Sequence, residues 1–224
     1  MIVALTALLG TALYAAAGYG GVRAAEYMIP KLQPFEDGPE PRNVNVWALV
    51  GGAGLLGLLL GLRVVPLWDL IAFAVLTACL VAIWYCDVRT GIVPDLFTLV
   101  PLGLAILVFL PGAISEVPQL LKFGITALPT LPHLYQLASA VVVSLPFAVA
   151  ALLSRGQGMG WGDVKLAALG GLILGMLIGT GLFGFASLAA VIVSAVRNRS
   201  KPVPLAFAPY LVAAIAIGIA LFAR

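Results

Sequence analysis

The sequence predicts an all-α membrane protein, a polytopic bundle of about eight transmembrane helices. Of its 224 residues, 62% are hydrophobic and only 9% are charged, and its mean hydropathy is +1.14. A soluble domain carries roughly 25% charged residues. Several apolar runs also reach the roughly 20 residues with which an α-helix crosses a bilayer. Alternating short strands, which would indicate a membrane barrel, are not found in the sequence.

Charges, prolines and glycines divide the apolar sequence into eight predicted spans. These are residues 2–21, 46–62, 66–86, 93–112, 135–153, 164–178, 180–196 and 203–222. The sixth and seventh share one apolar stretch, in which we place a tight turn near IGTG (178–181), with a single tilted helix as the alternative. The glycine pairs Gly57/Gly61 and Gly175/Gly179 have the spacing that lets helices approach closely.

The whole chain, residues 1–224, is predicted to form one integral-membrane domain. No basic residue precedes the first span and no clear cleavage site follows it, so we interpret it as a retained helix. Residues 22–45 form the longest polar segment. We predict this segment to be a short cytoplasmic loop, too small to have a core of its own.

The distribution of basic residues predicts the orientation in the membrane. With eight spans, both termini lie on the same side. One set of loops and helix ends contains nine basic residues, namely Arg23, Lys31, Arg42, Arg89, Arg155, Lys165, Arg197, Arg199 and Lys201. The opposite set contains three, namely Arg63, Lys122 and Arg224. Because cytoplasmic loops are richer in Lys and Arg, both termini are predicted to face outward.

Cysteine, histidine and net charge limit the classes of function. Cys79 and Cys86 lie in the third span and are expected to be reduced packing residues. His133, the only histidine, is predicted in an outside loop, so no metal-binding quartet can be assembled from these residues. The net charge of +3 is too small to indicate nucleic-acid binding. We therefore expect no metal and no nucleic acid, with membrane lipid as the surroundings.

Three of the nine acidic residues lie at the predicted inner membrane boundary, Asp87, Asp95 and Asp163. The others are Glu26, Glu36, Asp37 and Glu40 in the first cytoplasmic loop, Asp69 near an outer helix end, and Glu116 in an outside loop. An ionisable group at the depth of the membrane is costly, so the first three are candidates for function.

Asp87 and Asp163 are the best candidates for catalysis. Asp87 ends the third span in YCDVRTG, and Asp163 begins the sixth in GMGWGDVK. Two carboxylates brought together near lipid do not both ionise easily, so one of them would hold a proton. The ionised acid can then take a proton from water while the other donates one to a peptide carbonyl. A Ser-His or Cys-His pair is less well supported, because His133 is predicted on the far side.

Alternating glycines precede the second aspartate. Gly158, Gly160 and Gly162 leave little side-chain bulk beside Asp163. A backbone without Cβ atoms allows another strand to pass close, so an extended substrate could pair edge-on with this loop. A purely structural glycine cluster before a helix is the alternative.

Three segments resemble one known family. GMGWGDVK resembles the G-x-G-x-G-D-x-K signature of the type IV prepilin peptidases (leader peptidases), the membrane aspartic proteases of the glycine-x-glycine-aspartate group. CDVRTGIVPDLFTL resembles their first aspartate motif, and KPVPLAFAPYLVAAIAIG resembles their closing helix. The resemblance implies that Asp87 and Asp163 are the two catalytic aspartates. Gly160 and Gly162 match the glycines that define the group.

Two further charged residues match the motifs. Lys165 matches the lysine that follows the second aspartate. It is either a topology anchor on the cytoplasmic side or a residue that tunes the catalytic pair of aspartates, here called the dyad. Asp95 matches the acid of the Pro-Asp pair. Our interpretation of Asp95 from the residues alone is a helix-start acid that interacts with free N–H groups.

The resemblance also implies a substrate and a location. Substrates would be pilin-like precursors with a short basic leader, a glycine before the cut and an apolar helix after it. The protein would lie in the cytoplasmic membrane of a prokaryote, with its active site facing the cytoplasm. Glu36, Asp37 and Glu40 form an acidic patch that could attract the basic leader, or simply a solvated loop.

The N-terminal third departs from the family pattern. Many members have a larger insert with four metal-binding cysteines and also methylate the new N-terminus with S-adenosylmethionine. This chain lacks such cysteines, and GYGGVRAAEYMIPKL is only weakly similar to the matching family segment. Cleavage requires no cofactor, and S-adenosylmethionine would be needed only if methylation is retained.

Different classes of function are also compatible with the sequence. A proton-coupled transporter could use the same acids, because intramembrane acids also serve proton relays. A non-catalytic assembly component would keep the fold without the reaction. An intramembrane aspartic protease could also act on different substrates.

Overall fold

The computed structural model describes residues 2–32, 43–63, 65–154, 159–197 and 206–222. Within these ranges the chain is all-α, which confirms the predicted fold class. The α-helices are α1 (Ile2–Met28), α2 (Val46–Leu62), α3 (Leu67–Thr90), α4 (Asp95–Phe123), α5 (Pro132–Leu153), α6 (Trp161–Leu174), α7 (Met176–Arg197) and α8 (Ala208–Phe222). Two short 3-10 helices, η1 (Ile29–Lys31) and η2 (Ile125–Thr130), follow α1 and α4.

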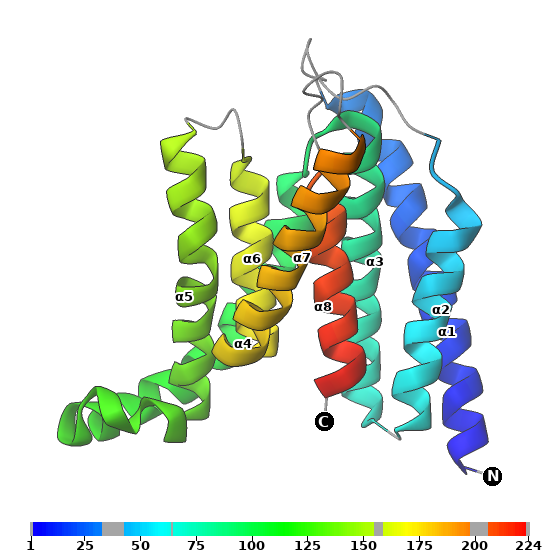
Figure 1. Cartoon of the computed structure of the whole chain (residues 1–224). Coiled ribbons are helices and arrows are strands. Elements are labelled where there is room, and N and C mark those ends of the chain that lie inside the picture. The colour runs from blue at the N-terminus through cyan, green and yellow to red at the C-terminus, as the bar shows by residue number, and fades with distance from the viewer. Residues whose placement is uncertain (1, 33–42, 64, 155–158, 198–205, 223–224) are drawn as a thin grey trace.

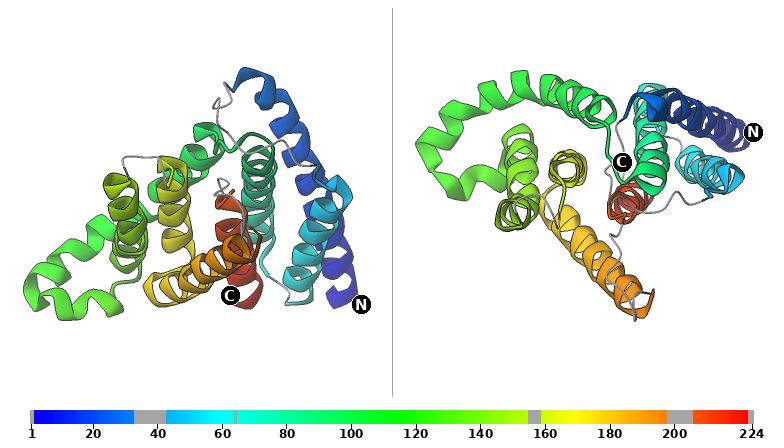
Figure 2. Two further views of the ribbon diagram at one scale, coloured as in Figure 1. Left: turned by 45° about the horizontal axis from the view of Figure 1, so that its top comes forward. Right: turned by 90° about the horizontal axis from the view of Figure 1, so that it is seen from above.

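The helices run alternately up and down, so both termini lie at the same end of the bundle (Figure 1). One group consists of α1, α2 and α3, with α1 packed against both partners. In the other group, α6 packs against α4, α5 and α7. The helix α8 joins the two groups because it contacts both α3 and α6. Seen from above, α4 follows a wide arc around α5 and α6 (Figure 2).

The surface of the bundle is suited to lipid. Five helical segments, at α1 with η1, α3, α4, α5 and α7, are long and apolar enough to cross a membrane, and α2 and α8 are shorter apolar helices. Large apolar side chains face outward, among them Val108 and Leu177, which are 73% and 83% exposed. Exposure on this scale would promote aggregation in water. The chain is therefore a multi-pass membrane protein.

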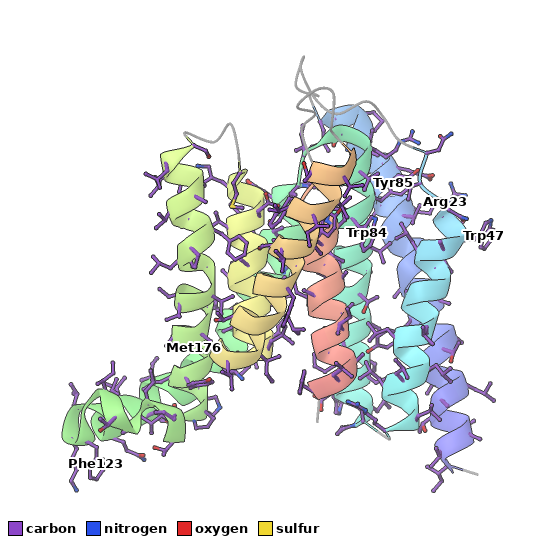
Figure 3. All side chains as sticks on the ribbon, in the orientation of Figure 1. Arg23, Trp47, Trp84, Tyr85, Phe123 and Met176 are labelled. Carbon is purple, nitrogen blue, oxygen red and sulfur yellow. The ribbon has the colours of Figure 1, made fainter. Side chains whose placement is uncertain are left out.

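Aromatic side chains mark the ends of the helices. Trp47 extends from the start of α2 at the upper end of the bundle, the end at which Arg23 also lies (Figure 3). Trp68 is exposed in the first turn of α3, whose first residues lie at the opposite end (Figure 1). Trp is enriched where a membrane helix meets the headgroups. Their positions therefore fit a bundle that crosses the bilayer along its length.

Glycines allow α1 and α2 to pack backbone to backbone. A Cβ atom added to Gly57 would lie 2.2 Å from the Gly10 carbonyl oxygen, and one added to Gly61 would lie 2.4 Å from the Thr6 carbonyl oxygen. The hydroxyl of Thr6 also donates to the carbonyl oxygen of Gly61 at 2.8 Å. These contacts confirm the role predicted for Gly57 and Gly61.

The turn between the sixth and seventh spans lies earlier than predicted. Gly175 has φ = 78°, in the left-handed region that favours glycine, and separates α6 from α7. The placement near IGTG was therefore wrong. Residues 178–181 instead belong to α7. Gly175 and Gly179 do not lie on one helix, but Gly179 does allow a close approach, since a Cβ atom there would lie 3.2 Å from Val143 Cγ2 and 3.5 Å from the Gly171 Cα. The sequence is apolar on both sides of the turn, so hydropathy alone did not reveal the break.

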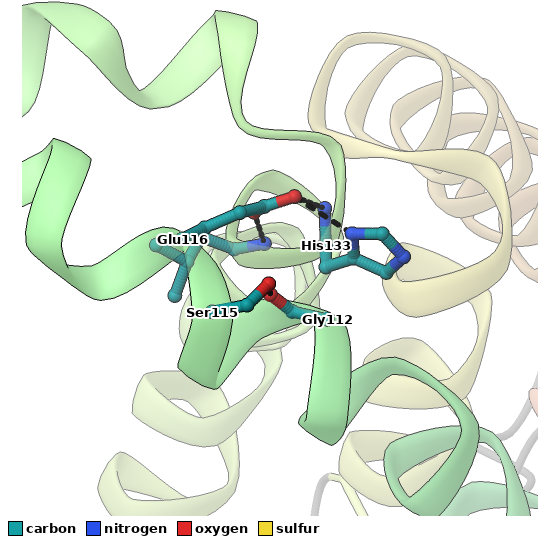
Figure 4. Close-up of polar contacts among 5 residues, drawn as sticks. Gly112, Ser115, Glu116 and His133 are labelled. Carbon is teal, nitrogen blue, oxygen red and sulfur yellow. Dashed lines mark hydrogen bonds and ion pairs between the residues drawn. The ribbon is translucent and has the colours of Figure 1, made fainter.

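The helix α4 continues well past its predicted end at residue 112. It includes Pro111 and Pro118 and ends at Gly124, and its last part extends sideways at the lower end of the bundle (Figure 1). Glu116, which was predicted in an outside loop, therefore lies in α4, and His133, also predicted in an outside loop, is the second residue of α5. The Glu116 carboxylate accepts from the His133 and Leu134 backbone N–H groups at 3.3 and 2.9 Å, and lies 2.7 Å from His133 Nδ1 (Figure 4).

The first polar segment is also shorter than predicted. The helix α1 extends to Met28 and η1 to Lys31, so the beginning of the predicted loop 22–45 is helical. Arg23 and Glu26 form an exposed ion pair on this extension at 2.9 Å. Glu36, Asp37 and Glu40 lie outside the described residues.

Candidate active site

Asp87 lies one turn before the end of α3 and is 5% exposed. The helix ends because Gly91 adopts φ = 68°, and its N–H donates to the Asp87 backbone carbonyl at 2.8 Å. Pro94 then precedes α4, a position at which its missing N–H costs little. The sequence of the first motif thus builds one helix end and the next helix start, with a buried acid beside the junction.

A second helix start fixes the carboxyl group of Asp87. Its Oδ2 accepts a hydrogen bond of 3.1 Å from the backbone N–H of Ala208, the first residue of α8. The first N–H groups of a helix have no partner within the helix, and the positive end of the helix dipole favours a nearby carboxylate. The α8 helix, which is remote from the α3–α4 junction in the sequence, thereby holds Asp87 in place.

Asp163 is the third residue of α6 and is 8% exposed. Its carboxylate accepts a hydrogen bond from the backbone N–H of Gly160, the residue that caps the helix. The Asp163 N–H in turn donates to the Gly160 carbonyl at 3.2 Å. This reciprocal arrangement resembles a capping box, with the acid at the third helical position reaching back to the cap. A backbone amide at a helix start therefore holds each of the two aspartates.

The fold brings both aspartates to the upper end of the bundle, near the end of α3 and the start of α6 (Figure 1). Both α4 and α8 pack against each of these helices. The carboxyl groups are close enough for the charge of Asp163 to act on Asp87. Two buried acids with a mutual interaction can divide the tasks of proton acceptor and proton donor.

The glycines before Asp163 have different surroundings. A Cβ atom on Gly162 would lie 2.6 Å from the Cβ of Val93, so this position requires glycine for the close approach of α6 to the α3–α4 junction. A Cβ atom on Gly160 would meet nothing nearer than 3.9 Å. Gly160 is also exposed, so its backbone is open to a ligand. Gly158 lies outside the described residues.

Lys165 and Asp95 meet each other. The Lys165 Nζ forms an ion pair with the Asp95 Oδ1, and the side chains are 29% and 64% exposed. The Asp95 carboxylate therefore pairs with α6, whereas the sequence favoured the free amides of its own helix as its partners. Lys165 was predicted either to anchor the topology or to tune the dyad. The contact with Asp95 is a third arrangement, which sequence reasoning missed.

The cysteines of α3 are not paired with each other. Cys86, beside Asp87, is buried, and Cys79 is half-buried on the same helix. In the ranges that the structure describes, no group of three or more His, Cys, Asp and Glu side chains is arranged to hold a metal ion.

The Ala208 amide and the Val93 side chain are functional-site contributors that the sequence did not single out. Pro209 could have indicated the Ala208 amide. Proline is favoured at the start of a helix, where the backbone amides have no partner within the helix. Nothing local in the sequence indicates that Asp87 is the acceptor. The contact between Val93 and Gly162 likewise joins two motifs that are far apart in the chain.

Comparison with known proteins covers the region that carries both aspartates. The model of the type IV leader peptidase family matches residues 74–196, more than half of the chain. The match contains the end of α3, the start of α4 and the whole of α6. Neither a curated protein nor a solved structure gives a match. From the family match, together with the multi-pass helical fold, we conclude that the chain belongs to the type IV leader peptidase family.

Proposed function

We propose that this peptidase is a membrane aspartic endopeptidase that cleaves the leader from type IV pilin-like precursors. The observation that supports this most is that two buried aspartates, Asp87 and Asp163, lie at one end of the bundle, close enough for the charge of one to act on the other. Each comes from a motif that matches the family, and a backbone amide orients each carboxylate. A transporter that used these acids would be expected to hold them near mid-membrane, whereas these lie at helix ends.

The mechanism requires one ionised and one protonated carboxyl group. The ionised acid removes a proton from a water molecule, and the oxygen of that water attacks the scissile carbonyl carbon. The second acid donates its proton to the carbonyl oxygen. When the diol intermediate collapses, one of its hydroxyl groups returns a proton to the second acid, the C–N bond breaks, and the leaving nitrogen receives a proton from the first acid. No covalent intermediate and no cofactor are needed, so S-adenosylmethionine would serve only a separate methylation step.

The substrate would approach from the side on which the aspartates lie. Basic residues predominate in the loops and helix ends predicted on this side, which supports a cytoplasmic site in a prokaryotic inner membrane. The apolar helix of a precursor would lie in the bilayer and bring the bond before it to the aspartates. The open backbone at Gly160 supports edge-on pairing with an extended leader.

Coexpression with a pilin-like precursor, followed by mass measurement of the product, tests this proposal. We expect cleavage with the natural chain and none with Asp87→Asn or Asp163→Asn, because an amide can neither accept nor relay the proton. Asp69→Asn is a matched control, since Asp69 is an exposed acid at the other end of α3. Cleavage by either active-site variant would rule out the dyad. The same mass reports any added methyl group.

The acidic residues of the first loop lead to a smaller prediction. Replacing Glu36, Asp37 and Glu40 together with Gln, Asn and Gln removes the charges that would attract a basic leader. We expect KM to rise several-fold at low salt with little change in kcat, and the difference to shrink as salt screens the charges. An unchanged KM would show that these acids take no part in capture.

A further inference from the structure

The ion pair between Asp95 and Lys165 connects the two segments that carry the aspartates. Asp95 is the first residue of α4, and Lys165 lies near the start of α6. The two positions are 70 residues apart in the sequence. In the described part of the chain, α3 and α6 have no extensive contact of their own, and they are held mainly through α4 and α8.

Both partners lie close to an aspartate along the chain. Lys165 follows Asp163 by two residues in the same helix. Asp95 follows Asp87 through a short junction in which the Gly91 N–H donates to the Asp87 carbonyl. Within the same junction, the Ile92 N–H donates to the hydroxyl of Thr90 at 3.2 Å. A change in the distance between Asp95 and Lys165 would therefore change the distance between the two catalytic carboxyls.

A second contact joins the same two segments. The side chain of Val93 lies against the backbone of Gly162, where even a methyl group would not fit. This contact limits how closely the segments approach, while the ion pair opposes their separation. Together they restrict the relative position of Asp87 and Asp163 from both directions.

We propose that Asp95 and Lys165 form a bracket that holds the two catalytic aspartates at their working separation, and that both are positioning residues. This inference rests on the proposed function. An ion pair with exposed side chains contributes little to overall stability. Catalysis responds even to that small energy, because about 1 kcal/mol in the placement of catalytic groups changes a rate about fivefold. The bracket should therefore affect turnover and leave both folding and substrate affinity nearly unchanged.

The test compares single and paired substitutions in the purified full-length enzyme with a pilin-like precursor. Asp95→Asn and Lys165→Met should each lower kcat by up to about fivefold with KM unchanged, the limit set by the roughly 1 kcal/mol of an exposed pair. Asp95→Lys and Lys165→Asp place like charges together and should each lower kcat at least as far. The double exchange Asp95→Lys/Lys165→Asp restores an ion pair and should recover most of the kcat that either single variant loses. Asp95→Glu and Lys165→Arg keep the pair and should stay within about 1.5-fold of the natural enzyme.

Several outcomes would overturn the bracket. If the double exchange recovers nothing, Lys165 acts through its own charge on the dyad or on the membrane. A rise in KM with kcat unchanged would mean that Asp95 binds the basic leader instead. Single variants with unchanged kcat would remove the role altogether. Unfolding temperatures in detergent identify any variant that loses activity by losing its fold.

The test separates this inference from the proposed function. If the natural enzyme cleaves the precursor and Asp163→Asn does not, the dyad stands whatever the Asp95 and Lys165 variants do. If the natural enzyme leaves the precursor intact, the proposed function itself fails.

Discussion

The two ends of α4 each carry an acid that reaches the start of another helix, but the two contacts differ in kind. Asp95 at the upper end is mostly exposed and forms a single ion pair with Lys165 of α6. Glu116 at the lower end is buried and accepts from two backbone amides at the start of α5 as well as approaching His133. The helix α4 is thus fixed to α6 near the aspartates by an exposed ion pair, and to α5 at the other end of the bundle by a buried carboxylate.

The difference in burial indicates whether each contact contributes mainly to stability or mainly to the geometry of the site. Removing a buried carboxylate leaves two partly buried amides without their partner, which costs more than losing a charge pair in contact with solvent. The Glu116 contact therefore contributes mainly to stability. The exposed pair at Asp95 contributes mainly to the geometry of the aspartates. Substitutions at the two ends should change different measured quantities.

The largest effect on stability is expected from Glu116→Ala. It removes the acceptor of two amide hydrogen bonds and the partner of His133, and should lower the unfolding temperature by roughly 5–10 °C. Turnover at a temperature where the variant is folded should remain close to normal. Thermal unfolding in detergent and precursor cleavage measure the two quantities. Glu26→Ala, which breaks the exposed pair with Arg23, is the control and should lower the unfolding temperature by less than about 2 °C.

Ala208→Pro, at the end of the bundle that carries the aspartates, should have a smaller effect. It should change the rate of cleavage and not the unfolding temperature. Proline lacks the N–H that donates to Asp87 but is tolerated at the first position of a helix. The loss of a hydrogen bond to a charged group, about 1.5–3 kcal/mol, should slow cleavage roughly ten- to a hundredfold. Ala208→Gly keeps the N–H and should keep most of the activity. Equal rates for the two variants would show that the amide does not orient Asp87.

The smallest expected effect concerns the contact of α6 with the α3–α4 junction. Gly162→Ala places a methyl group against Val93 and should cost about 1–3 kcal/mol of stability, because the packed segments must separate. Gly160→Ala has free space and should fold normally, which makes it the matched control. Adding Val93→Ala to Gly162→Ala should restore much of the loss. If Gly162→Ala and Gly160→Ala are equally stable, the close approach is not what requires glycine.

The fold was largely predictable, and the error at the end of α4 has a clear physical cause. Each predicted span overlaps one of the observed α-helices, because length and hydropathy are local properties. The prediction ended α4 at Pro111 and Gly112, since these residues usually terminate helices. In the structure the helix continues, and its last part is fixed to α5 through Glu116. A tertiary contact overrode the local signal.

The site was predictable as a set of motifs but not as a set of contacts. The sequence pointed to Asp87 and Asp163 because an acid at a membrane boundary is costly and because the glycines alternate before the second one. It did not predict that Lys165 pairs with Asp95, or that Ala208 donates to Asp87. Each of these partners is remote in the chain.

By itself, the sequence determined that this chain crosses the membrane several times and that two aspartate motifs lie at helix ends. Hydrophobic length and local capping residues decide those properties within a few turns of helix. The tertiary structure alone decided which helix start faces Asp87, which acid holds Lys165, and which amides Glu116 caps. Those pairings depend on the register in which separate helices pack, and packing is fixed by side-chain shapes that have no local signature in the chain.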